Sequence, residues 1–272
     1  MTFLRTAPLS AATGPVTGPA SGVPAAPAVN RAVLRALSIL ELLSRSDGPV
    51  TLGELSGELK IPKSSALTLL RALVAAEFCV ADDRGFYALG IHSFEVGAAY
   101  LRSMTPVRSV TPELQWLTES LGVTSHFAVL ERDEVIYLAK HDPPGLGLKL
   151  ASSLGARLPA AVTAVGKAQL AYRSTVFPGA GVLEGSTAGG AAPAGLELQR
   201  VRRLGYAVDD GQTAVGIRCV AAPLFNDRGC CGAIGVSYLL GGVPDVPTVA
   251  GAVMEAAGRA SARLGGRETG GR

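Results

Sequence analysis

The chain has 272 residues, enough for one large domain or two ordinary ones, and 48% of them are apolar, which is ample for a buried core. No stretch approaches the ~18 uninterrupted apolar residues of a transmembrane helix, and the N-terminus lacks the apolar segment of a secretory signal, so we expect neither a membrane protein nor an exported one. The net charge of +3 is too small to indicate a class of partner.

The cysteines and histidines show no spacing typical of a disulfide framework or a metal site. Two of the four cysteines are adjacent, and no C-x-x-C spacing occurs among Cys79, Cys219, Cys230 and Cys231. This usage is typical of a reducing compartment, so we expect free thiols and a cytoplasmic protein. The three histidines complete no zinc signature with these cysteines, and we therefore expect no metal and no other cofactor.

Residues 1–29 consist largely of Ala, Pro, Gly, Thr and Ser, and Arg5 is their only charged residue. Such a segment cannot bury enough apolar surface to offset the entropy lost on ordering, so a disordered tail is predicted. A single arginine also excludes a long basic arm that follows DNA.

Residues 30–90 have the pattern of three helices followed by a β-hairpin. Asn30 is a predicted N-cap. The first helix carries four apolar residues at helical spacing: Val33, Leu37, Leu40 and Leu43. A capping box at Thr51–Glu54 opens the second helix, and a third follows after a short break. Residues 78–81 and 86–89 are β-prone and flank a turn that contains glycine. This order of elements predicts a winged helix-turn-helix.

The third helix carries the argument for DNA binding. Its predicted buried face consists of Ala66, Leu69, Leu70 and Leu73. The opposite stripe presents small hydroxyls and one arginine, which fit the major groove, and the helix N-terminus attracts phosphate. In a helix-turn-helix, the N-terminal part of this helix meets the bases. We predict DNA contacts at six residues of the third helix and the hairpin turn: Lys63, Ser64, Ser65, Thr68, Arg71 and Arg84.

The charge balance of this segment does not favour DNA. Residues 30–102 hold eight basic and eight acidic residues, and the hairpin turn carries Asp82 and Asp83, which phosphates repel. Binding would rest on a local basic cluster and on a dimer that doubles the contacts. A packing module with a solvated helix face is therefore an open alternative at this point.

The rest of the chain predicts an α+β domain. A helix with Ile91, Phe94 and Leu101 on one face ends before Pro106, and Thr111-Pro112 is interpreted as the cap and first position of the next helix. Strand-like, helical and loop patterns follow in order: strands at 124–130, 135–140 and 148–151, a helix at 164–172, a loop at 178–195, a helix at 196–204, a hairpin at 219–225 and 230–237, and a helix at 246–264. Asp209 and Asp210 are expected just after a strand.

Several separated segments resemble IclR-type transcriptional regulators. In the first part these are residues 35–40, Thr51-Leu52-Gly53-Glu54-Leu55, Ile61-Pro62-Lys63-Ser64-Ser65, residues 69–73 and Tyr87-Ala88-Leu89-Gly90. Downstream they are Gly155-Ala156-Arg157-Leu158-Pro159, Gly166-Lys167-Ala168, residues 205–210 and residues 216–223. The resemblance implies a winged helix-turn-helix at 30–90, a linker helix at 91–108 and a GAF-like effector-binding domain at 109–272. It also implies a homodimer or homotetramer on palindromic double-stranded DNA, controlled by a small organic effector.

By the same resemblance, seven residues are candidates for effector binding: Ala164, Val165, Asp209, Ile217, Cys219, Gly235 and Ser237. Two departures from the family pattern concern function. Thr68 stands where the recognition helix usually carries arginine, so the DNA sequence that is read is expected to differ. Gly235 stands where a hydroxyl residue is common, and we expect it to open space for an effector larger and less polar than two- or three-carbon oxo acids.

Two alternatives to a ligand-responsive DNA-binding regulator fit parts of the sequence. A cysteine hydrolase would use Cys219 with His126 or His141 and Asp209, but no nucleophile motif supports catalysis, and the first domain would have no role. A sensor that binds its ligand without binding DNA is favoured by Thr68 and by the acidic hairpin turn.

Overall fold

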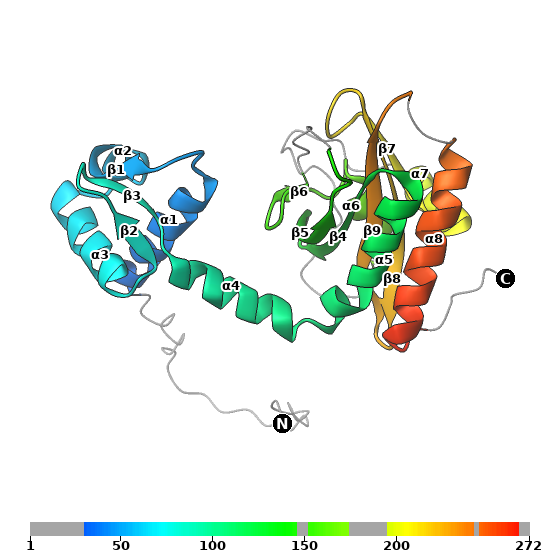
Figure 1. The fold of residues 1–272 in the computed structure, drawn as a ribbon, viewed down its shortest axis with the longest axis horizontal. Coiled ribbons are helices and arrows are strands. Elements are labelled where there is room, and N and C mark those ends of the chain that lie inside the picture. The colour runs from blue at the N-terminus through cyan, green and yellow to red at the C-terminus, as the bar shows by residue number, and fades with distance from the viewer. Residues whose placement is uncertain (1–29, 146–151, 174–194, 242–244, 267–272) are drawn as a thin grey trace, which may run out of the picture. The chain divides into compact units, whose positions relative to one another are not determined.

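The computed structural model describes residues 30–145, 152–173, 195–241 and 245–266, which form two units divided between Phe94 and Glu95 (Figure 1). The tail predicted at 1–29, the strand predicted at 148–151 and the loop predicted at 178–195, except Gly195, lie outside these residues. None of the helices in the described ranges combines the length and the apolar character needed to cross a membrane.

The first unit has the element order of a winged helix-turn-helix. Its elements are α1 (Arg31–Arg45), β1 (Val50–Thr51), α2 (Leu52–Glu58), α3 (Lys63–Ala75), β2 (Cys79–Ala81), β3 (Phe86–Leu89) and the start of α4 (Ile91–Ser103). The strands form an antiparallel sheet in the order β1-β3-β2. The sequence did not predict β1, because two residues are too few to show an alternating pattern.

The helix starts follow the predicted capping chemistry. The Asn30 side chain accepts hydrogen bonds from the amides of Ala32 and Val33 at the start of α1. At α2, Glu54 N donates to the Thr51 hydroxyl, and the Glu54 carboxylate accepts from Thr51 N at 2.8 Å. Both ends of this capping box are satisfied, so the predicted start of the helix is confirmed.

The buried face of α1 differs from the predicted one. Ile39, Leu42 and Leu43 are buried, whereas Val33 and Leu37 are 54% and 50% exposed. Apolar residues surround much of this helix, so spacing alone cannot select the face that meets the core. The C-terminal half of α1 packs into the core of the unit, and the apolar residues of its N-terminal half stay exposed.

The second unit is a six-stranded antiparallel sheet with helices on both faces (Figure 1). The strands run in the order β6-β5-β4-β9-β8-β7. Their bounds are β4 (Thr124–Glu131), β5 (Glu134–His141), β6 (Arg157–Pro159), β7 (Ala207–Asp210), β8 (Ile217–Asn226) and β9 (Gly229–Leu239). The helices are α5 (Thr105–Leu121), α6 (Ala164–Leu170), α7 (Gly195–Leu204) and α8 (Val246–Arg263).

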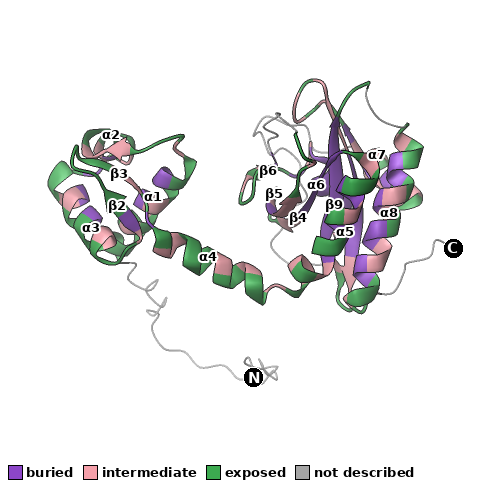
Figure 2. Ribbon diagram, viewed as in Figure 1, coloured by how far each residue is buried: buried purple, intermediate pink, exposed green. Residues whose placement is uncertain are grey.

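Alternate residues of the strands supply two cores, one on each face of the sheet. Phe127, Val220 and Ile234 pack with α5 and α8 on one face, and Ala128, Ala221 and Ala233 pack with α6 and α7 on the other. The buried residues in Figure 2 accordingly follow the sheet and the inner sides of its helices. The second face has the smaller side chains, and the pocket described below lies on it.

Three expectations about this unit are corrected. The helix predicted to start at Thr111 is α5, which begins at Thr105 and contains Pro112. The Thr111 hydroxyl donates backward to the carbonyl of Val107 instead of capping a helix start, and the end of the predicted linker helix at 108 lies within α5. Asp209 lies inside β7 and Asp210 ends that strand. The short strand β6 was not predicted.

Candidate functional site

The second helix of the helix-turn-helix is α3, and its predicted polar stripe faces solvent. Lys63, Ser64, Thr68 and Arg71 are exposed, Ser65 is half-buried, and Ala66 and Leu70 are buried on the opposite side. The Thr68 hydroxyl donates to the carbonyl of Ser64 at 3.0 Å, so this short side chain is held against the helix backbone in the middle of the stripe. Pro62, the N-cap residue of α3, makes no side-chain hydrogen bond to the helix, so it leaves the amides of the first turn open to an anion.

The turn before α3 is fixed by one serine. The Ser56 hydroxyl on α2 donates to the carbonyl of Ile61 at 2.6 Å, and the Ile61 amide donates to the carbonyl of Ser56. The Ile61 side chain is buried in the core of the unit. The direction in which α3 leaves α2 is therefore held by hydrogen bonds and by packing.

One of the two carboxylates in the acidic hairpin turn stabilises the turn itself. Asp82 accepts hydrogen bonds from the amides of Arg84 and Phe86, at 3.0 and 2.8 Å, and so stabilises the turn between β2 and β3. The side chain of Arg84 is exposed beside it. The turn presents one guanidinium together with the carboxylates of Asp82 and Asp83.

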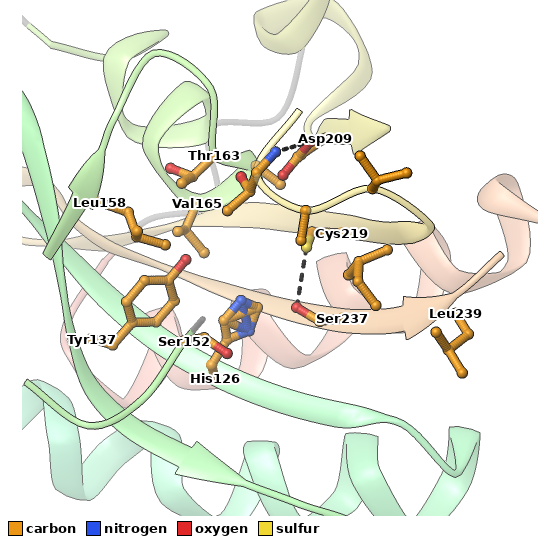
Figure 3. A pocket seen from close by; sticks show the side chains of 15 residues that line it. His126, Tyr137, Ser152, Leu158, Thr163, Val165, Asp209, Cys219, Ser237 and Leu239 are labelled. Carbon is orange, nitrogen blue, oxygen red and sulfur yellow. Dashed lines mark hydrogen bonds between the residues drawn. The ribbon is translucent and has the colours of Figure 1, made fainter. Parts of the chain in front are cut away.

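In the second unit, a pocket of about 260 Å³ lies on the face of the sheet that carries α6 (Figure 3). Each of the six strands contributes at least one lining residue. The register explains part of the arrangement, because Asp209 pairs with Cys219, and Cys219 pairs with Ser237. Three adjacent strands thus place a carboxylate, a thiol and a hydroxyl in one row, and Cys219 Sγ lies 3.1 Å from Ser237 Oγ.

Six of the seven predicted effector residues line this pocket: Ala164, Val165, Asp209, Ile217, Cys219 and Ser237. Gly235 is not among the described lining residues, and the expectation that it opens space for a larger effector stays a prediction. A β-carbon at Gly235 would lie 3.0 Å from His126 Cε1 and 3.1 Å from Val165 Cγ1. The missing side chain therefore lets these two residues approach the sheet.

His126 and Tyr137 also line the pocket, although the sequence named His126 only as a partner of Cys219 in the alternative hydrolase and did not single out Tyr137. Their rings stack at 5.2 Å between centroids with an angle of 5° between planes. His126 Nδ1 lies 2.8 Å from the carbonyl oxygen of Gly235, so it is the protonated nitrogen. Burial, with the charge of Lys140 nearby, lowers the pKa of His126 to about 3, and the ring is neutral. Residues on both faces of β4 and β5 are buried, so the sequence shows no alternation of apolar and polar residues that would tell which face His126 and Tyr137 take.

Asp209 is the carboxylate of the pocket. Its side chain is 1% exposed, and Oδ1 accepts hydrogen bonds from the amides of Gln212 and Thr213, at 2.7 and 3.4 Å. These contacts hold the loop after β7 over the pocket, where Thr213 and Val215 join the lining. The loop therefore depends on Asp209 for its position.

The thiol of Cys219 is not arranged as a nucleophile. Burial raises its pKa to about 11, so it is protonated at neutral pH. Its polar partner is the Ser237 hydroxyl, and the protonated nitrogen of His126 is bound to a backbone carbonyl. Within the described ranges, no three His, Cys, Asp or Glu side chains gather as metal ligands would.

A winged helix-turn-helix with an exposed polar stripe, joined in one chain to a domain with a small pocket, defines a ligand-responsive DNA-binding regulator. Two family models match these parts separately. Residues 32–83 match the IclR helix-turn-helix domain, and residues 98–259 match the bacterial transcriptional regulator IclR C-terminal domain. The chain belongs to the IclR family of transcriptional regulators.

Known relatives cover both units. The chain is 31% identical over 218 residues to the transcriptional repressor IclR of Escherichia coli, an alignment that covers 76% of this chain and 79% of the relative. An IclR-type transcriptional regulator from Alicyclobacillus acidocaldarius has the same fold, with 27% identity, a TM-score of 0.73, and coverage of 88% of this chain and 100% of that one. An IclR homologue from Microbacterium hydrocarbonoxydans, solved in complex with 4-hydroxybenzoate, is 19% identical, with a TM-score of 0.72 and coverage of 86% and 98%.

Proposed function

We propose that the chain binds palindromic double-stranded DNA as a homodimer or homotetramer, and that α3 and the hairpin turn make the contacts. The contact residues of this proposal are Lys63, Ser64, Ser65, Thr68, Arg71 and Arg84. The observation that carries it is the solvent-facing stripe of α3, which combines small hydroxyls with one guanidinium and ends in an uncapped N-terminus beside Lys63. Lys63 and Arg71 supply charge for phosphates or guanine edges, and the short side chains allow close approach to the groove.

A gel shift with the intergenic DNA upstream of the gene tests this assignment. Lys63→Ala and Arg71→Ala each weaken binding, and each lowers the salt dependence of log K by about 0.9 for every phosphate that is no longer neutralised. Arg157→Ala is the control, because it removes the same charge from an exposed residue of the other unit. Unchanged affinity and salt slope in both α3 variants would contradict the assignment and favour a sensor that does not bind DNA.

The effector site of this proposal is the pocket of the second unit. Ala164, Val165, Ile217 and Cys219 would supply the walls, and Asp209 and Ser237 the polar contacts. A pocket of mainly apolar lining with a few convergent polar groups is typical of a small-molecule site. The Microbacterium homologue, which has the same fold, holds a small organic ligand, and this adds support.

The remaining parts of the proposal concern organisation. The DNA-binding domain spans 30–90, the segment 91–108 links it to an effector domain at 109–272, and the protein acts in the cytoplasm. It has no enzymatic activity of its own. The high pKa of Cys219 and the engaged Nδ1 of His126 support this, because a cysteine hydrolase needs a thiolate beside a histidine that accepts its proton.

A further inference from the structure

The loop that follows β7, residues 211–216, forms one wall of the pocket. Its lining residues are Thr213, Ala214 and Val215. Both ends of the loop are glycines with positive φ, 79° at Gly211 and 80° at Gly216, a backbone conformation that other residues rarely adopt. This wall of the pocket therefore has a glycine at each end about which it can turn.

Lys167 on α6 holds this loop, although it is not itself a lining residue. Its side chain is 3% exposed and forms an ion pair with Glu197 on α7 at 2.8 Å. The ammonium also donates to the carbonyl of Val208 on β7 at 3.2 Å and to the side-chain carbonyl of Gln212, which belongs to the loop. An ammonium has three donors, so all three are used by contacts with α7, β7 and the loop.

The three partners of Lys167 differ in how they can move. Val208 lies in a strand and Glu197 in a helix, whereas Gln212 lies between the two glycines of the loop. A buried ammonium is stabilised only while its donors have partners, so the contact with Gln212 stabilises the arrangement in which the loop lies over the pocket. Opening of the loop has to break that contact.

Asp209 holds the same part of the loop through the backbone. Its Oδ1 accepts hydrogen bonds from the amides of Gln212 and Thr213, and the dashed line at Asp209 in Figure 3 marks one of them. Two buried side chains of opposite charge thus meet at Gln212, Lys167 at its side chain and Asp209 at its amide. Polar contacts of this kind can break and re-form without disturbing the apolar core.

We propose that loop 211–216 is the movable wall through which a ligand enters and leaves the pocket, and that Lys167 is the positioning residue that keeps this wall closed. This inference deepens the proposed function, because the loop belongs to the proposed effector site. Opening of the loop uncovers the lining residues next to it, Cys219 among them. A ligand that contacts the loop favours the closed arrangement, so effector affinity depends on a lysine that does not touch the effector.

Two measurements on the full chain report opening of the loop without a ligand or DNA. Hydrogen exchange of the amides at 212 and 213 follows the loop itself. Alkylation of Cys219 by iodoacetamide, quantified by peptide mass spectrometry, follows access to the pocket. Cys231 is the internal reference, because it packs with the apolar cluster on the other face of the sheet and reports general unfolding.

Two variants remove the contact from either side. Lys167→Met removes the charge but keeps an unbranched side chain, and Gln212→Ala removes the side-chain partner but keeps the amide. Each is expected to raise the exchange rate and the Cys219 alkylation rate at least about tenfold, because a hydrogen bond to a buried charge contributes this much to the opening equilibrium. Adding Gln212→Ala to Lys167→Met is expected to change either rate by less than about twofold, because the contact is already lost.

Matched controls come from α7. Arg203→Met removes the same charge and Gln199→Ala makes the same truncation, both at exposed positions, and neither is expected to change the two rates. Gln212 is exposed, so its variant decides the question if Lys167→Met does not fold. Unchanged rates in Gln212→Ala, an equal rise at Cys231, or additive effects in the double variant would overturn the inference.

Failure of this inference can be distinguished from failure of the proposed function, because operator binding is measured separately by gel shift. If the rates respond as expected but the wild type binds no operator DNA, the regulator assignment fails and the role of the loop stands. If the wild type binds operator DNA and the rates do not respond to either variant, only the inference fails.

Discussion

His126 shows how burial can set the charge of a single residue. The ring is fully buried between the sheet and the pocket, and burial, together with Lys140, lowers its pKa to about 3. The sequence alone favours a structural or exposed histidine here, because one polar residue in an apolar strand does not reveal which face it takes. The register of β4 with β9 places it beside Gly235, and only the folded sheet shows this.

The depressed pKa of His126 predicts a pH dependence of stability. In the unfolded chain a histidine binds its proton at about pH 6.5, whereas in the folded chain it does so at about 3. The unfolded state therefore binds more protons between these values, and this contribution to the free energy of unfolding is complete above the unfolded pKa and is lost as pH falls. His126→Gln is expected to weaken the loss of stability between about pH 7 and 5.

Urea unfolding at several pH values measures this dependence. His141→Gln is the control, because His141 is exposed at the end of β5, and its slope should match that of the wild type. If His126→Gln and wild type lose stability in parallel on acidification, His126 is not held neutral by burial.

At the scale of elements, local chemistry was easier to predict than packing. The caps at Asn30 and Thr51 follow from side chains next to one another in sequence. The buried face of α1 and the start of α5 did not, because they depend on contacts with distant segments. Pro112 matched the pattern of a helix start, although the helix already extends back to Thr105.

The motif Gly166-Lys167-Ala168 has a steric basis that predicts the effect of a mutation. A β-carbon at Gly166 would lie 2.1 Å from the carbonyl oxygen of Ala160, so the backbone itself would have to move. Gly166→Ala is expected to destabilise the effector domain by about 1–3 kcal/mol or more. Gly251→Ala in α8 is the matched control, since that site has open space and alanine there is expected to stabilise by up to about 1 kcal/mol.

Thermal and denaturant unfolding of the two variants give the comparison. The two substitutions are expected to shift the free energy of unfolding in opposite directions. The general preference of helices for alanine over glycine acts in one direction only and cannot produce this difference. A neutral Gly166→Ala variant would mean that α6 lies farther from Ala160 than the structure places it.

At the scale of the whole molecule, the candidate site was partly predictable from sequence. Resemblance to the family indicated Asp209 and Cys219, which belong to recognisable segments, and also Ser237, which lies outside those segments. It could not locate His126 or Tyr137, which join the pocket only through strand register and stacking. The surroundings of Gly235 could not be predicted for the same reason, since the side chains that lie against it come from other elements.

Oligomerisation also belongs to this scale. Each chain has one α3, and its DNA-binding unit carries no excess of positive charge, so a single copy would make few phosphate contacts. Exposed apolar residues, Val33 and Leu37 on α1 and Ile91 and Phe94 on α4, are available for contact with a second copy. We expect light scattering at micromolar concentration to show a dimer or tetramer.

Selection of duplex DNA from a random library by the protein tests directly whether paired α3 helices read the operator. We expect a two-fold symmetric sequence whose half-sites are separated by about one helical turn or a multiple of it. A Lys63→Ala, Arg71→Ala double variant is expected to enrich no sequence, while Arg157→Ala is expected to enrich the same one as the wild type. Selection of an asymmetric site, or of the same site by the double variant, would show that paired α3 helices do not read the operator.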